Sequence, residues 1–124
     1  MMAQNNYIDE LEQNHNLWLE DINTIKEEIS DLITELAEKI DDNEELPICK
    51  KLSDAQNNLV GLHMLFENLV TDIINFRYAL RRYSKHHAMA LQSNYFQKHK
   101  KLATAIQRNK NQFDAYKAEA RSLL

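Results

Sequence analysis

Histidine supplies the side chains in this sequence that are best suited to chemistry, because imidazole binds metals and titrates near neutral pH. The chain holds five histidines in 124 residues. Three of them, His15, His87 and His99, fall in the apolar seams of predicted helices. Glu12 precedes His15 by three residues, a spacing that puts both on one helical face. These four residues are the candidates for a mononuclear metal or pH-sensitive site. The alternative is that they are ordinary polar residues near a bundle end, satisfied by hydrogen bonds.

Larger metal centres and enzymatic sites lack support in the sequence. A ferritin-like di-iron site needs a second Glu-x-x-His pair, and only His15 has a glutamate three residues before it. The sequence shows no glycine-rich phosphate loop and no Ser/His/Asp or Cys/His arrangement that can be placed together. We therefore expect a protein that is not an enzyme, with no cofactor and no small-molecule substrate.

Basic residues form a second candidate, an interaction surface around the middle of the chain. Its members are Arg77, Arg81, Arg82, Lys85, Lys98, Lys100 and Lys101. Residues 1–47 sum to −12 and residues 48–124 to +8, giving the net charge of −4. A basic segment with interleaved tyrosines resembles the ingredients of a nucleic-acid surface, but the pI of about 5.7 argues against strong phosphate binding. We predict that the acidic segment neutralises the basic one within the chain, and that nucleic acid is an unlikely partner.

Helices must position these residues. One glycine and one proline in the whole chain are too few for a turn-rich or sheet fold. Apolar residues recur at alternating steps of three and four in three segments, which predicts amphipathic helices over approximately 7–42, 48–91 and 94–123. The fold class is all-α, an antiparallel three-helix bundle of long heptad-patterned helices in a single domain, 1–124. The alternative is a long helical hairpin with a continuous 48–124 helix that dimerises.

The second turn decides which histidines meet. Asn94 and Gln97 have the spacing of a capping box, which favours a turn at 92–94. The cations Arg77, Arg81 and Arg82 suit a helix C-terminus and favour a turn at 84–88, and a continuous helix needs no turn. In an antiparallel bundle, a turn near 93 puts His87 and His99 in one layer. A turn near 86.5 puts His15 and His99 in one layer, with Glu12 close by.

The sequence also supports predictions about how the protein assembles and where it is located. The seams are broadened by apolar residues at their flanks, including Leu19, Ile33, Leu65, Val70 and Ile74. This is more apolar surface than a three-helix core needs, so we predict a two-fold homodimer with coiled-coil-like packing. No signal peptide pattern and no apolar run of about 20 residues is evident, and the single cysteine excludes an internal disulfide. We expect a cytoplasmic protein without membrane contact.

The predicted function is a non-enzymatic helical protein–protein interaction or assembly subunit. One alternative is a metal-binding or sensory helical bundle that uses the seam histidines. The other is a nucleic-acid-associated protein that uses the basic residues of the second and third helices.

Overall fold

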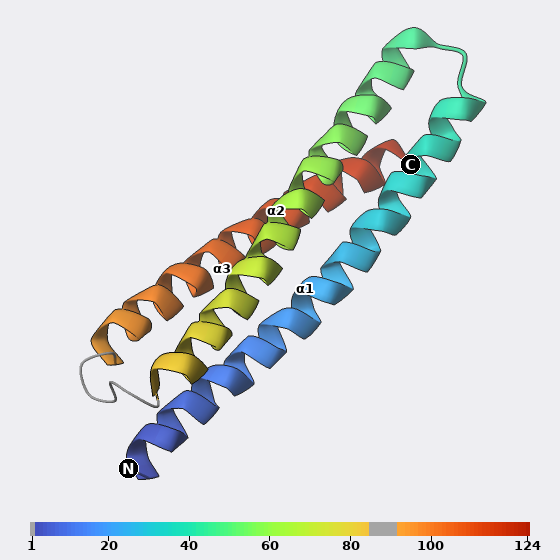
Figure 1. Ribbon diagram of the computed structural model, residues 1–124. Helices are drawn as coiled ribbons and strands as arrows, with labels where there is room; N and C mark the ends of the chain where they lie inside the picture. The colour runs from blue at the N-terminus through green and yellow to red at the C-terminus, as the bar shows by residue number, and fades with distance from the viewer. Residues whose placement is uncertain (1, 85–91) are drawn as a thin grey trace.

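Three long helices make up the protein. The computed structural model describes the backbone of residues 2–84 and 92–124, and the side chains of 9–82 and 95–124. Helix α1 spans Met2–Asp42, α2 spans Leu46–Ser84 and α3 spans Gln92–Leu123. The helices pack side by side into a rod (Figure 1). The predicted all-α antiparallel three-helix bundle is confirmed.

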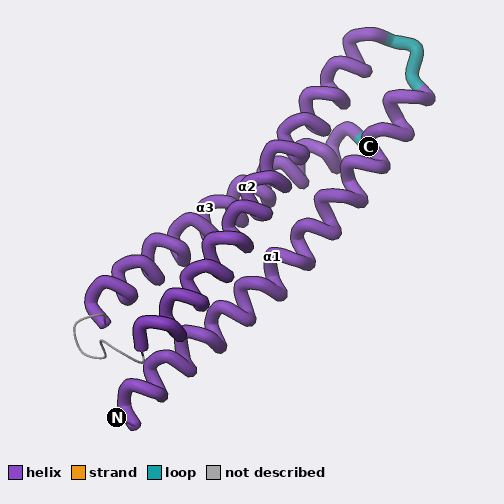
Figure 2. Tube along the Cα trace, viewed as in Figure 1, coloured by secondary structure: helices purple, strands orange, loops and turns teal. Residues whose placement is uncertain are grey.

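The first turn is short and tied by hydrogen bonds. Only residues 43–45 separate α1 from α2 (Figure 2). The Asn43 side-chain amide donates to the Lys39 carbonyl at 3.1 Å, and the Cys49 thiol donates to the Asn43 carbonyl at 3.3 Å. Pro47 stands in the first turn of α2, where its missing N–H would have had no intrahelical acceptor. These contacts fix the hairpin between α1 and α2.

The second reversal differs from the favoured expectation. Helix α2 ends at Ser84 and α3 begins at Gln92, so residues 92–94 are helical and a turn there is wrong. A continuous 48–124 helix is also wrong, because α2 and α3 are separate helices that pack against each other. Arg81 and Arg82 lie in the last turn of α2, where positive charge meets the negative end of the helix dipole. The rest of the predicted 84–88 turn lies outside the described residues.

The core consists of the predicted seams. Its fully covered side chains come mainly from α1 and α2, with a smaller contribution from α3. They are Leu11, Ile22, Ile29, Leu32, Leu36, Leu52, Ala55, Leu59, Leu62, Phe66, Leu69, Ile73, Phe76, Leu80, Leu102, Ile106, Phe113 and Ala120. Of the flanking residues expected to add surface, Leu19, Ile33 and Val70 are partly buried, whereas Leu65 and Ile74 are exposed. Leu65 and Ile74 are nine residues apart and so lie on opposite sides of α2.

Opposite charges join α1 to α3. Lys110 Nζ lies 2.9 Å from Asp21, and Lys117 Nζ lies 2.8 Å from Glu28, seven residues further along both helices. Near the C-terminus, Arg121 lies 3.6 Å from Glu35. Exposed pairs of this kind contribute only ~0.2–1 kcal/mol each, but their common spacing sets how α3 lies along α1. The predicted neutralisation of the acidic segment by the basic one is confirmed at these contacts.

Helix α2 is the most apolar of the described helices. Over Leu46–Arg82 it reaches a mean hydropathy of 1.2 in an 18-residue window, enough to cross a membrane by length and composition. One third of that window is buried inside the bundle, and the core helix of a bundle passes the same test. The absence of membrane contact stays a prediction.

Candidate functional site

Two histidines meet near one end of the bundle. His15 of α1 is fully buried, and its Nε2 lies 3.4 Å from Nδ1 of His99 on α3. The sequence predicted this pairing for a second turn centred near residue 86.5. The favoured prediction, a turn at 92–94, placed the end of α2 later in the chain. His87 lies outside the described residues, so its predicted pairing with His99 stays a prediction.

Aromatic rings enclose the histidine pair. The ring of Trp18 stacks on that of His99 with centroids 4.7 Å apart and planes 25° apart. Phe76 of α2 meets His15 edge-on, with centroids 5.2 Å apart, and Tyr95 meets Phe76 edge-on in turn. The imidazoles therefore lie in an apolar environment contributed by all three helices.

This environment favours neutral imidazoles. Burial, the neighbouring His99 and the cation Arg77 lower the pKa of His15 from 6.5 to about 4, against a smaller raising effect of Glu12. Burial also lowers the pKa of His99. With both rings neutral at pH 7, one ring N–H donates to the facing nitrogen of the other ring. His15 Nδ1 is buried and has no hydrogen-bond partner among the described residues, which costs free energy.

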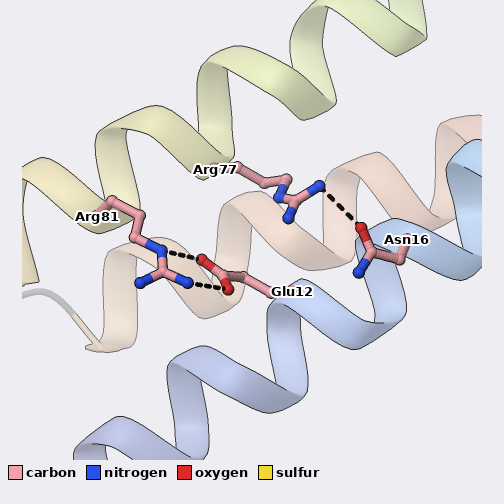
Figure 3. Close-up of polar contacts among 4 residues, drawn as sticks. All are labelled: Glu12, Asn16, Arg77 and Arg81. Carbon is pink, nitrogen blue, oxygen red and sulfur yellow. Dashed lines mark hydrogen bonds and ion pairs between the residues drawn. The ribbon is translucent and has the colours of Figure 1, made fainter.

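Glu12 is committed to a different partner. Arg81 of α2 forms a two-point contact with its carboxylate, Nε to Oε1 at 2.5 Å and Nη2 to Oε2 at 2.6 Å (Figure 3). One turn away, Arg77 Nη1 donates to Asn16 Oδ1 at 2.9 Å. Glu12 is mostly buried while Arg81 is largely exposed. The carboxylate is therefore near the histidines, as predicted, but its oxygens are used to join α1 to α2.

The pair offers two metal ligands. Two nitrogens bound at ~2.0–2.1 Å to one tetrahedral metal lie about 3.4 Å apart, which is the separation of His15 Nε2 and His99 Nδ1. Among the described residues, no cluster of three or more His, Cys, Asp or Glu side chains could hold a metal.

The predicted basic surface is divided by the fold. Arg77 and Arg81 face α1 and hold Asn16 and Glu12. Arg82, Lys98, Lys100 and Lys101 are exposed, and Lys85 lies outside the described residues. Lys100 Nζ lies 4.6 Å from the ring centroid of exposed Phe96. The structure thus leaves these four cations and Arg81 at the surface, and their role in nucleic-acid binding stays a prediction.

A second surface emerges on α2, and we call it the α2 outer face. It comprises Val60, Met64, Glu67, Thr71, Ile74 and Tyr78, which follow one another at steps of four and three. At 100° per residue this line runs opposite the core seam of α2. Val60 is 41% exposed, Met64 60%, Ile74 52% and Tyr78 68%. Of these six residues, only Ile74 was expected at a flank from the sequence. The alternating steps of four and three could have identified the others once the core seam of α2 was assigned.

In comparisons with known proteins, no family model, no curated protein and no solved structure matches the chain.

Proposed function

We propose that this protein is a non-enzymatic helical subunit that acts through protein–protein contact, and that the α2 outer face is its contact surface. The exposure of four large apolar side chains in one line on one helix carries the proposal. Exposed apolar residues scattered singly are normal on protein surfaces, whereas grouped ones mark interaction sites. Here Val60 and Met64 form one pair and Ile74 and Tyr78 a second, with Glu67 and Thr71 between them.

The setting of this line supports the proposal. Its one charged residue, Glu67, has partners within the chain, since its carboxylate lies 3.4 Å from His63 Nδ1 and 3.9 Å from Lys26 Nζ. Unpaired charge is costly to desolvate in a contact surface. The α2 outer face therefore combines apolar side chains with one acidic residue that has a cation beside it.

Capture experiments with the full chain test this function. Immobilised wild type is compared with Met64→Glu, which places a charge in the line, and with Leu17→Glu as matched control. Leu17 is 59% exposed, close to Met64, but lies on α1. We expect Met64→Glu to lose bound partners, including added copies of the chain itself, while Leu17→Glu retains them. Equal capture by all three proteins would contradict the proposal.

A second candidate function is metal binding or sensing by His15 and His99. The observation in its favour is the 3.4 Å between their facing nitrogens, which matches two ligands on one metal. The nearby cation Arg77 opposes it, because it lowers the affinity of the site for a metal cation as it lowers the pKa of His15.

Titration with Zn²⁺ tests this candidate on protein without a histidine tag. Two pre-placed imidazoles bind a metal more tightly than one can, so His99→Gln is expected to weaken Zn²⁺ binding at least tenfold. The control is His63→Gln, since His63 lies on α2 beside Glu67. Equal and weak binding by wild type, His99→Gln and His63→Gln would leave the histidines as structural residues.

A further inference from the structure

The α2 outer face is symmetric along the helix. Its steps read four, three, four, three, four, so the line is the same in both directions about a centre at residue 69. Val60 and Tyr78 lie equally far from that centre, as do Met64 and Ile74. When two copies of α2 pack in opposite directions about residue 69, a residue of one copy lies at the same height as the residue of the other copy that is equally far from residue 69 on the other side. Each apolar residue of one copy would thus meet an apolar residue of the other.

The polar residues also match in this arrangement. Glu67 and Thr71 mirror each other about residue 69, so each carboxylate lies level with the hydroxyl of the other copy. Both are exposed. The Thr71 hydroxyl donates to the Glu67 carbonyl of its own helix at 3.3 Å, and in the pair it would turn to donate to the facing carboxylate instead. The centre of the contact is therefore polar.

Charges at the ends of the line complement each other too. Asp54 and Arg82 are exposed and are 28 residues apart, which is four heptads, so both occupy the same position in the heptad pattern of α2. In an antiparallel helix pair related by a two-fold axis, the same flank of each copy lies on the same side of the pair. Asp54 of one copy then lies level with residue 84 of the other copy, two residues from Arg82. The symmetry repeats this pairing at both ends.

A parallel pair would be less favourable. It would place Glu67 directly opposite Glu67 of the second copy, and like charges in contact destabilise a helix pair. It would also place Asp54 opposite Asp54 and Arg82 opposite Arg82. The acidic α1 of one copy would face the basic α3 of the other, but these helices lie behind α2, where salt screens their attraction.

The size of the strip sets the strength of the contact. From Asn57 to Arg81 the helix is roughly 36 Å long, and a single helix face is about 10 Å wide. Two such strips bury roughly 700 Å² in total, below the ~1,200–2,000 Å² of standard specific interfaces, so we expect a weak, transient dimer that forms in the micromolar range or above.

From this symmetry and charge match we infer that the partner of the α2 outer face is a second copy of this chain, docked with α2 antiparallel to α2 about a two-fold axis near residue 69. This inference rests on the proposed function and adds to it the partner and its orientation.

Spin labels measure the orientation directly. In a Cys49→Ser background, a single label is placed at Asn57 or at Asn68, both exposed and at the flank of the line. The antiparallel pair separates the two Asn57 positions by about 36 Å along the helix, but the two Asn68 positions by only about 3 Å. A parallel pair gives one short separation at both sites, and that result would overturn the inferred orientation while leaving contact through the α2 outer face intact.

Charge exchange provides an independent test. Arg82→Asp is expected to raise the dissociation constant of the dimer at least threefold, and the double variant Asp54→Arg with Arg82→Asp to restore it. Failure of the double variant to restore dimerisation counts against the end contacts. A chain that stays monomeric at millimolar concentration overturns the inference, even if wild type still captures another protein that Met64→Glu fails to capture. That last pattern preserves the proposed function, so the two failures are distinguishable.

Discussion

His15 is the residue with the most unusual surroundings in the described part of the chain. Its side chain is fully buried, one ring nitrogen faces His99, and the other has no partner among the described residues. A leucine or phenylalanine there would bury the same volume without an unsatisfied polar atom. The histidine therefore lowers the stability of the fold.

Acid should destabilise the protein through this residue. In the unfolded chain His15 takes up a proton near pH 6.5, whereas in the folded chain its pKa is about 4. Between these values the proton favours the unfolded state, so stability is highest above pH 6.5 and declines as pH falls towards 4. The full difference corresponds to about 3 kcal/mol.

His15→Phe removes this titration and the unsatisfied nitrogen. We expect its free energy of unfolding to exceed that of wild type, by more at pH 5 than at pH 7, as measured by urea denaturation. His63→Gln is the control, because His63 is a partly exposed residue beside Glu67. A pH dependence of His15→Phe as steep as that of wild type would show that other groups carry it.

At the residue scale, the sequence predicted the helical face and the layer of a residue better than the side chains that the residue contacts. Counting residues outward from each turn indicated that His15 and His99 lie in the same layer of the bundle if the second turn is near residue 86.5. The engagement of Glu12 by Arg81 was not predicted, because it depends on which way two long side chains point. Seam spacing determines which face a residue occupies but not the rotamer it adopts.

At the scale of the helix, periodicity was a reliable guide to the interior. The residues on the three predicted seams supply the buried core. The boundary between α2 and α3 was harder to predict, because a capping spacing at Asn94, a cation cluster at Arg81 and Arg82, and helix-forming residues between them indicated three different answers. Each of these signals is worth about 1 kcal/mol or less, so none of them decides alone.

Replacing Gly61 tests whether α2 is a continuous helix whose flank at this residue has no close neighbour. A Cβ added there meets nothing within 4 Å among the described residues, so a close helix contact does not explain the glycine. Gly61→Ala should raise the free energy of unfolding by about 1 kcal/mol through helix propensity. Thermal or urea denaturation measures this, with Ala79→Gly on the same helix as the reverse control. A destabilised Gly61→Ala would indicate that another chain packs closely against this flank.

At the scale of the whole molecule, charge organises the bundle and apolar surface remains on α2. The acidic α1 is joined to α3 by ion pairs along its length and to α2 by the contact of Glu12 with Arg81. The sequence showed the charge asymmetry and an excess of apolar flank residues. It did not show which flank stays exposed, since that depends on how three helices divide the available positions between them.

Light scattering at graded concentrations tests the central claim, that the α2 outer face is a contact surface between two copies of the chain. The account predicts that wild type and Leu17→Glu approach twice the chain mass of 14.6 kDa as concentration rises through the micromolar range. Met64→Glu should stay at 14.6 kDa with an unchanged helical spectrum. A wild type that stays at the mass of one chain up to millimolar concentration, or a Met64→Glu variant that dimerises as well as Leu17→Glu, would contradict it.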